Sequence, residues 1–385
     1  MGKDSWILDA IKGSAFGTKL SALKKFLFEK SKVEDLTKCA LCPNMCRFSC
    51  PISIVDGKET TSPAGKSRIA FLLRKGYIEK NIENVLPLYY CLSCNVCSTW
   101  CPFEFSVGDV IRPIRGEIMR QGVYPESLRD VLENLRNYHC VYGEIEGNAQ
   151  YPKDGDTLYI RGCLVRKFYP QATDKAIELL RILGYNPLIL DNEKCCGYLA
   201  YEIGDDDTFI EIATKNAEEI NSLGINTIVT ACPECAYTYR VLYPQYKIKI
   251  KAKVYHITEI IKMHLDKLNF REKKETVTIH DPSKLAINLD QPNILTDILS
   301  RIPKLKVKLP MRHGKNTFEC GNGNNLLTWI DADLLEMINL ERLKELNEES
   351  EIIITASYAC KKGLEDVGGK VYDITEYVLD AIKKD

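Results

Sequence analysis

Sixteen cysteines are the side chains of this 385-residue chain with the clearest chemistry. They stand at positions 39, 42, 46, 50, 91, 94, 97, 101, 140, 163, 195, 196, 232, 235, 320 and 360. Thiolates bind soft metals and carry electrons, whereas a large chain in a reducing compartment has little use for eight disulfides. Their clustering therefore indicates metal or redox centres.

The first cluster of cysteines consists of two similar runs. They read Cys39-x2-Cys42-x3-Cys46-x3-Cys50-Pro51 and Cys91-x2-Cys94-x2-Cys97-x3-Cys101-Pro102. The second run has the bacterial ferredoxin spacing, in which three thiolates hold one [4Fe–4S] cluster and the fourth reaches its neighbour. On this pattern one cubane takes Cys39, Cys42, Cys46 and Cys101, and the other takes Cys91, Cys94, Cys97 and Cys50. Structural zinc is the alternative, but paired four-cysteine runs that end in Cys-Pro favour iron–sulfur clusters.

Helices are expected to position these two loops. About forty residues separate the runs, and the segment 65–77 has apolar residues at helical spacing. This organisation resembles the α-helical ferredoxin domains found in the succinate dehydrogenase and heterodisulfide reductase complexes. An amphipathic helix pair is expected from Ile7 to Lys30, as a packing or subunit-docking element.

Beyond residue 150 the pattern alternates between strand and helix. Strands are expected at 157–161, 187–190 and 227–230, and helices at 171–183, 209–223 and 234–242. Such alternation predicts an α/β domain with a mostly parallel sheet. The cysteines of this region follow the strands, where open α/β sheets keep their sites. Asp205, Asp206 and Asp207 are expected to cap the helix from Phe209.

The five cysteines of this region read Cys163-x31-Cys195-Cys196-Gly197-x34-Cys232-x2-Cys235. The motif resembles the cysteine-rich CCG domain of the B and D subunits of heterodisulfide reductase. It also resembles that of the glycolate oxidase, lactate-utilisation and anaerobic glycerol-3-phosphate dehydrogenase iron–sulfur subunits. The resemblance implies that these five thiolates hold a non-cubane [4Fe–4S] cluster and form the catalytic site. Gly197 is expected to let the backbone approach closely. Structural zinc or free core thiols are the alternatives.

The same unit recurs once. Residues 253–259 (KVYHITE) match 370–376 (KVYDITE), and 227–232 and 160–163 match 352–357 and 280–283. The five cysteine positions then read Ser283, Glu319, Cys320, Ser357 and Cys360. Two thiolates do not hold a four-iron cluster in the usual way, so the second copy is interpreted as a degenerate structural half. Whether Cys320 and Cys360 act as a dithiol, bind metal or line the substrate pocket stays open.

Composition excludes other classes. The formal charge of −1 argues against a nucleic-acid partner, and no apolar run is long enough for a transmembrane segment. No secretory signal is visible, so the expected location is cytoplasmic, with membrane contact only through a partner. The chain has no GxGxxG turn in a βαβ setting, so no flavin or nicotinamide site is expected in it. Cys140 lies outside every motif and is interpreted as a structural thiol.

We therefore predict an α+β multidomain protein. Residues 1–150 form N-terminal helices and an α-helical dicluster ferredoxin domain. Residues 151–270 and 271–385 form two pseudo-repeated, Rossmann-like CCG domains, the second degenerate. This organisation resembles the D subunit of heterodisulfide reductase, which implies an oxidoreductase subunit acting on thiol or disulfide sulfur.

Two alternatives to this function stay open. One is an electron-transfer subunit of an FAD-dependent glycolate, lactate or glycerol-3-phosphate dehydrogenase, and the other is a zinc scaffold. Expected partners are a flavoprotein, ferredoxin-like or cytochrome subunit and a thiol, disulfide or quinone substrate.

Overall fold

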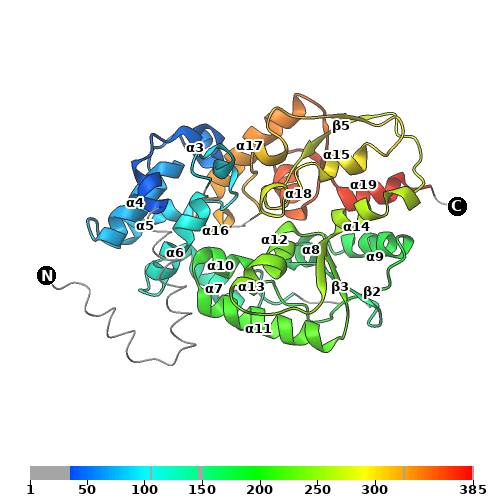
Figure 1. The fold of residues 1–385 in the computed structure, drawn as a ribbon, viewed down its shortest axis with the longest axis horizontal. Coiled ribbons are helices and arrows are strands. Elements are labelled where there is room, and N and C mark those ends of the chain that lie inside the picture. Colours follow the sequence, from blue (N-terminus) through cyan, green and yellow to red (C-terminus); the bar gives the residue numbers. More distant parts are fainter. Residues whose placement is uncertain (1–34, 105, 146–150, 324–325, 384–385) are drawn as a thin grey trace.

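The computed structural model describes residues 35–104, 106–145, 151–323 and 326–383. In Figure 1 a helical part, blue to cyan, lies at one end, beside two halves that each contain a sheet, green and yellow to red. The predicted helix pair at Ile7–Lys30 lies outside the described residues. Among the described helices, none is long and apolar enough to cross a membrane.

The helical part holds both ferredoxin-like cysteine runs. Its elements are η1 (Met45–Ser49), α3 (Pro51–Asp56), α4 (Pro63–Lys75), α5 (Ile82–Tyr89), η2 (Val96–Trp100), α6 (Val107–Met119), η3 (Glu126–Leu128) and α7 (Arg129–Tyr138). Helix α4 confirms the predicted helix between the runs. It begins because the Ser62 side chain accepts from Gly65 N–H and Pro63 fills the first position, and it ends at Gly76 with φ of 72°.

The first sheet-containing half has four parallel strands in the order β2-β1-β3-β4. They are β1 (Thr157–Ile160), β2 (Pro187–Leu188), β3 (Thr227–Thr230) and β4 (Lys253–His256). Its helices are α8 (Cys163–Phe168), α9 (Ala172–Ile182), α10 (Tyr198–Ile203), α11 (Asp206–Ser222), α12 (Pro233–Tyr237), η4 (Thr238–Leu242), α13 (Tyr243–Gln245), α14 (Ile257–Met263) and η5 (Leu265–Lys267). The predicted strands and helices of this half are confirmed, with small shifts at their ends.

The second half repeats this strand order. Its parallel sheet runs β6-β5-β7-β8, from β5 (Thr276–His280), β6 (Lys306–Lys308), β7 (Ile352–Thr355) and β8 (Lys370–Asp373). Its helices are η6 (Lys284–Asn288), α15 (Ile294–Leu299), η7 (Gly314–Asn316), α16 (Leu327–Ile330), α17 (Ala332–Asn347), α18 (Tyr358–Asp366) and α19 (Ile374–Ala381). The equal strand orders agree with the sequence repeat.

Two details differ from the sequence prediction. Asp205 caps α11 by accepting from Thr208 N–H, but the helix begins at Asp206 rather than at Phe209. The helix predicted over 234–242 changes after Tyr237 into a π-helical turn, η4. A second π-helical turn, η6, follows Ser283 in the other half. Such turns are rare and occur often at functional sites.

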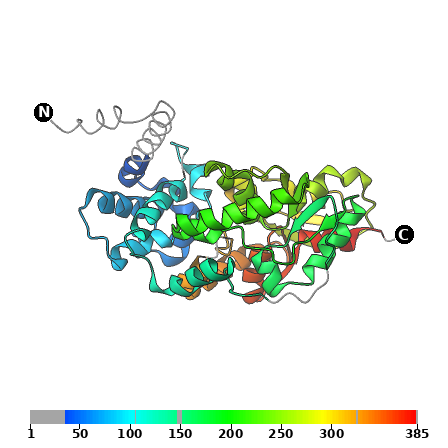
Figure 2. The same cartoon turned by 90° about the horizontal axis from the view of Figure 1, so that it is seen from below.

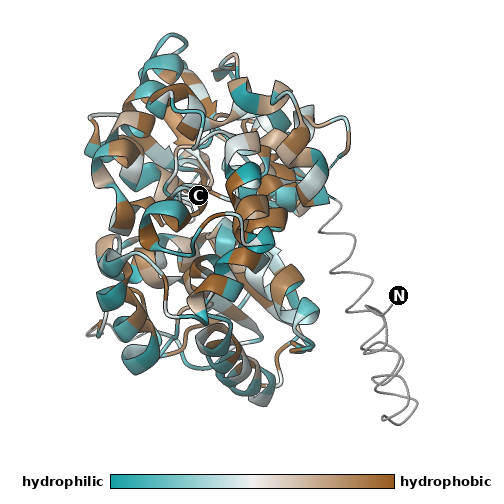
Figure 3. Ribbon diagram, turned by 90° about the vertical axis from the view of Figure 1, so that its left-hand side faces the viewer, coloured by the Kyte–Doolittle hydropathy of each residue, from teal (hydrophilic) through white to brown (hydrophobic). Residues whose placement is uncertain are grey.

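The three parts share their cores. One apolar cluster joins the helical part to the first sheet, a second joins the two sheet-containing halves, and a third joins α3 and α17 through Ile52 and Leu335. Helix α9 packs on α19 across the two halves. The turned view in Figure 2 keeps the helical part at one end. Figure 3 shows brown and teal residues alternating along single helices, as amphipathic helices around a buried core require.

Candidate functional site

The two ferredoxin-like runs fold into the same local structure. Asn44 and Asn95 adopt left-handed φ values of 65° and 64°, and each is followed by a five-residue 3-10 helix. Each helix ends on the fourth cysteine of its run, Cys50 or Cys101, in extended conformation. Both asparagines stand six residues before that cysteine, so the extra residue of the first run, Pro43, falls outside the repeated turn.

One cavity lies near the surface of the helical part. Four of its lining cysteines are the set predicted for one cubane: Cys39, Cys42, Cys46 and Cys101. Cys97 also reaches this cavity. Its rim includes Met45, Trp100 and Phe103, whose side chains are exposed. This cavity is therefore close to solvent.

A second cavity lies deeper in the helical part. Its lining cysteines are the other predicted set: Cys50, Cys91, Cys94 and Cys97. The two cavities share Cys97 and Val107, so they are neighbours. Buried Lys66 also lines the second cavity, and its ammonium donates to Tyr90 O at 3.2 Å. A buried cation beside thiolates lowers the cost of their negative charge.

The chemistry of these donors fits an iron–sulfur cluster. Burial raises the pKa of Cys39 to about 11 and that of Cys46 to about 12. Thiols with so high a pKa keep their protons at neutral pH, whereas a bound metal displaces the proton and leaves a thiolate. A cavity where four thiols converge, with Cys39 and Cys46 costly to ionise without metal, is therefore suited to bind one. The assignment of each ligand set stays a prediction.

The five cysteines of the CCG motif line a third cavity. Cys163 opens α8 after β1, Cys195 and Cys196 precede α10, and Cys232 and Cys235 begin α12 after β3. All five thus gather at the carboxyl edge of the first sheet, as expected for an open α/β sheet. The Cys232 sulfur also caps α12, accepting from Cys235 N–H at 3.4 Å.

The sulfurs of this cavity differ in their electrostatics. Hydrogen bonds from the thiols of Cys195 and Cys235 lower the pKa of Cys196. The pKa of Cys163 is raised by its hydrogen bond with Cys195 and by burial. Cys196 therefore ionises readily, and its thiolate would be the first ligand to bind a metal in this cavity.

Two glycines with positive φ stand beside this cavity. Gly162 has φ of 80°, and a Cβ there would meet Cys232 Cβ at 3.6 Å and Cys235 Sγ at 3.7 Å, which are ordinary contact distances. Gly197 has φ of 87°, and a Cβ there would meet Phe209 Cδ2 at 3.0 Å, which is tighter than an ordinary contact. The close approach at Gly197 is thus to the Phe209 ring rather than to the sulfurs.

Sequence reasoning missed two residues beside this cavity, Glu193 and Glu234, and interpreted a third, Cys140, as a structural thiol. The Glu193 carboxylate accepts from Arg161 N–H and Gly162 N–H at 3.1 and 2.7 Å, which fixes the turn before Cys163. Cys140 lies near Cys163, and burial together with that neighbour raises its pKa to about 11. Glu234 lines the cavity, and burial raises its pKa to about 7. Of the two glutamates, only Glu234 has a signal in the sequence, because it lies between the two cysteines of the Cys-x2-Cys motif.

A larger hollow adjoins the third cavity. It has a volume of about 340 Å³ and shares four lining residues with the five-cysteine cavity: Tyr142, Leu164, Asn322 and Ala359. Phe168, Thr328 and Lys362 add to its wall. Asn322 and Ala359 belong to the second half, so the site lies between the two halves.

The second half keeps the framework of the motif with different side chains. Ser357 caps α18 and accepts from Cys360 N–H at 3.4 Å, as Cys232 does for Cys235. Ser283 donates through its hydroxyl to Glu319. Cys320, Cys360 and His280 converge, with their ligand atoms within 4.8 Å of one another. The predicted degeneracy thus leaves a compact sulfur pair.

Known families match both cysteine regions. Residues 35–120 match the 4Fe-4S dicluster domain, and residues 157–240 match the cysteine-rich (CCG) domain. These matches support iron–sulfur clusters in both regions.

Relatives extend the similarity over most of the chain. The B subunit of fumarate reductase (CoM/CoB) from Methanothermobacter marburgensis is 28% identical, covering 88% of this chain and 71% of that protein. The D subunit of dihydromethanophenazine:CoB–CoM heterodisulfide reductase from Methanosarcina barkeri is 26% identical, covering 76% and 77%. A probable glycolate oxidase iron-sulfur subunit of Bacillus subtilis is 23% identical, covering 54% and 59%.

A solved structure shares the fold. The crystal structure of a hypothetical protein from Helicobacter pylori superposes with a TM-score of 0.58 at 11% identity, covering 99% of this chain and 76% of that one. The similarity is one of architecture.

Proposed function

From the premise that this chain is an iron–sulfur protein like the D subunit of heterodisulfide reductase, we propose that it is an oxidoreductase subunit acting on thiol or disulfide sulfur at the five-cysteine cavity. The observation that carries the proposal is the convergence of Cys163, Cys195, Cys196, Cys232 and Cys235 beside a hollow of about 340 Å³. A bound non-cubane [4Fe–4S] cluster would supply iron that binds one substrate sulfur and delivers electrons. Two relatives have CoM and CoB in their names.

We assign the ligands of two [4Fe–4S] cubanes as the sequence predicts. Cys39, Cys42, Cys46 and Cys101 would hold the first, and Cys50, Cys91, Cys94 and Cys97 the second. The pairing rests on which cysteines line each cavity. Cys97, which reaches both cavities, makes the two clusters neighbours.

The arrangement supports an electron path from the surface inward. The first cavity has an exposed rim, so a partner subunit would exchange electrons there. The second cavity lies behind it, and Ser93 beside Cys94 contacts both of the other parts of the chain. Its hydroxyl donates to Glu202 at 2.6 Å, and its carbonyl accepts from Lys284 at 3.1 Å. The third cavity follows at the junction of the two halves.

The residues around the third cavity would bind and orient substrate. Glu193 holds the turn before Cys163 in place by accepting from Gly162 N–H. Tyr142 and Leu164 line both this cavity and the larger hollow, so both would contact a substrate that reaches from one into the other. A cytoplasmic location, with membrane contact through a partner subunit, stays a prediction.

One alternative has a specific observation in its favour. The similarity to a glycolate oxidase iron-sulfur subunit supports an electron-transfer subunit that serves an FAD-dependent 2-hydroxyacid or glycerol-3-phosphate dehydrogenase. In that role the five-cysteine centre would only relay electrons or meet a quinone.

EPR spectroscopy of the anaerobically purified protein, poised through a redox titration with and without a small thiol, tests the proposal. We expect cubane signals on reduction and a new paramagnetic species on oxidation that requires the thiol. Cys196→Ser should remove the thiol-dependent species and keep the cubane signals, whereas Cys46→Ser should remove one cubane signal and keep the species. Spectra that are indifferent to thiols would favour the electron-transfer role.

A further inference from the structure

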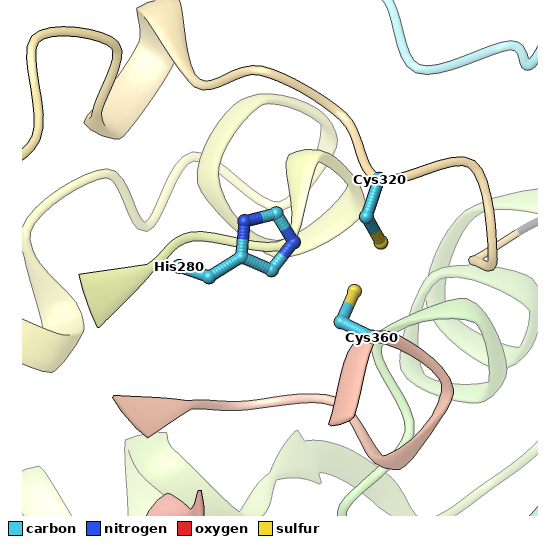
Figure 4. A group of neighbouring side chains, drawn as sticks. All are labelled: His280, Cys320 and Cys360. Carbon is cyan, nitrogen blue, oxygen red and sulfur yellow. The ribbon is translucent and has the colours of Figure 1, made fainter. Parts of the chain in front are cut away.

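His280, Cys320 and Cys360 form a buried cluster in the second half (Figure 4). His280 ends β5, Cys320 lies in the loop before α16, and Cys360 stands in the first turn of α18. The two sulfurs point toward each other, and the imidazole points at them. The exposed fractions of Cys320 and Cys360 are 0% and 1%, so an external disulfide cannot attack them directly.

The residue types alone would suit a zinc ion, but the hydrogen bond behind His280 opposes it. Arg342 Nε donates to His280 Nδ1 at 3.1 Å, and a guanidinium has no acceptor atom. Nδ1 therefore carries no proton, and the neutral ring has its proton on Nε2. A histidine that binds metal through Nε2 instead donates its Nδ1–H to an acceptor.

The imidazole thus presents an N–H donor to the two sulfurs. Nε2 of His280 is buried and has no hydrogen-bond partner among the residues that the structure describes. The charged guanidinium of Arg342 on the far side of the ring polarises this N–H toward the sulfurs. Such a donor stabilises a sulfur that carries negative charge.

A proton acceptor stands on the other side of the pair. The Cys320 thiol donates to Glu319 Oε1 at 3.5 Å. Ser283 and Gly321 donate to the same carboxylate, which holds it in place. A proton that leaves Cys320 therefore has an oxygen to accept it.

The sulfur pair also adjoins the redox cavities. Asn322, Gly323 and Ala359, close to the two cysteines in sequence, line the five-cysteine cavity. The charge of Glu319 acts on Cys94, in the second cubane cavity. The pair therefore lies between two sites where iron–sulfur clusters are proposed.

We propose that Cys320 and Cys360 form an internal dithiol–disulfide couple that stores two electrons between the iron–sulfur centres and the substrate. In the reductive direction the Cys320–Cys360 S–S bond takes two electrons from the iron–sulfur centres and two protons, and breaks to give two thiols. In the reverse direction the S–S bond forms, two electrons return to oxidised iron–sulfur centres, and the protons leave by way of Glu319.

The role of this couple depends on the proposed function. Reduction of a disulfide needs two electrons, whereas each cluster transfers one at a time. The first half of the chain has all five cysteines of the motif. The second half keeps only Cys320 and Cys360 of the five positions, and this dithiol holds two electrons, which return to the iron–sulfur centres as the S–S bond forms.

The test measures the oxidation state of Cys320 and Cys360 rather than the turnover of substrate. The anaerobic full-length protein is poised at a series of potentials, unfolded in an alkylating reagent and digested, and the peptides of Cys320 and Cys360 are weighed by mass spectrometry. We expect both cysteines alkylated at low potential and cross-linked at high potential, with a two-electron dependence. Cys140→Ser, which removes another buried thiol, should keep the cross-link.

Variants of the cluster sharpen the test. In Cys360→Ser, Cys320 should be alkylated at every potential. In His280→Phe, which removes the Nε2–H donor, formation of the cross-link should be slower by roughly tenfold. Two free thiols across the whole range, or stoichiometric zinc that Cys360→Ser loses, would overturn the proposal. Either failure leaves the thiol-dependent EPR species of the five-cysteine centre as a separate question.

Discussion

Single residues decide how closely the backbone approaches the proposed centres. Spacing alone predicted that Cys50 and Cys101 would exchange between the two runs, and each lines the cavity of the other run. Spacing could not predict the contacts of Glu193 and Cys140, since neither belongs to the motif: Glu193 accepts from Gly162 N–H, and Cys140 acts electrostatically on Cys195. The sequence predicted a close backbone approach at Gly197, and the structure has a tight approach there, but to the Phe209 ring rather than to the sulfurs.

A pair of glycine variants separates backbone strain from a close approach beside the five-cysteine cavity. Gly197 and Gly184 have φ of 87° and 88°, but a Cβ at Gly197 would meet Phe209 Cδ2 at 3.0 Å, whereas a Cβ at Gly184 would meet nothing within 4 Å. Gly197→Ala and Gly184→Ala should each lower the free energy of unfolding by about 1 kcal/mol through strain. Only Gly197→Ala should also displace the neighbouring Cys196, and so lower the iron content and change the EPR signal of the five-cysteine centre. Equal iron content in the two variants would contradict this role of Gly197.

The repeated strand–helix unit is the main feature at the scale of elements. The matching segments KVYHITE and KVYDITE become β4 with α14 and β8 with α19, so the repeat was visible in the sequence. The π-helical turns η4 and η6 were not visible, because their sequences keep ordinary helical composition. Within the repeat, His256 and Asp373 are matched helix caps of opposite chemistry.

These two caps should affect stability in opposite directions with pH. Burial lowers the pKa of His256 to about 4 and raises that of Asp373 to about 7. Between pH 4 and 6.5 the unfolded chain protonates His256 and the folded chain does not, so this group adds stability as pH rises. Between pH 4 and 7 folded Asp373 keeps a proton that unfolded Asp373 loses, so this group removes stability as pH rises.

Asp373→Asn isolates the second effect. The difference in free energy of unfolding between the variant and wild type should shift in favour of the variant, by on the order of 3 kcal/mol, from pH 5 to pH 8. The difference between the two thermal unfolding midpoints at each pH measures this gain, since other groups titrate alike in both proteins. Midpoints that stay equally far apart at the two pH values would show that Asp373 is ionised in the folded protein.

At the scale of the whole molecule, buried polar contacts join the helical part to the first half. Arg115 is fully buried and donates to Leu88 O and Cys91 O within the helical part, and to Glu202 at 3.2 Å in α10. These contacts fix the second cubane loop against the first half. The sequence could not predict this joint, because a contact across 87 positions leaves no periodic signal.

Loss of the Arg115 contacts should destabilise the folded protein. Arg115→Met leaves the Glu202 carboxylate buried without its cation and should lower the free energy of unfolding by about 3–5 kcal/mol. Arg120→Met is the matched control, since Arg120 directly follows the same helix but is exposed, and its ion pair with Asp206 should be worth less than about 1 kcal/mol. Thermal unfolding of both variants compares them. Similar losses would mean that the Arg115 contacts do not hold the parts together.

Binding of substrate sulfur to iron at the five-cysteine centre is the central claim of this account. The most direct measurement is the EPR spectrum of the oxidised protein with a small thiol labelled with ³³S, recorded against the unlabelled thiol. We predict that the thiol-dependent signal broadens with the labelled thiol, because the magnetic sulfur nucleus is bound to the paramagnetic centre. A thiol-dependent signal of unchanged width, or no such signal, would contradict the claim and favour an electron-transfer role.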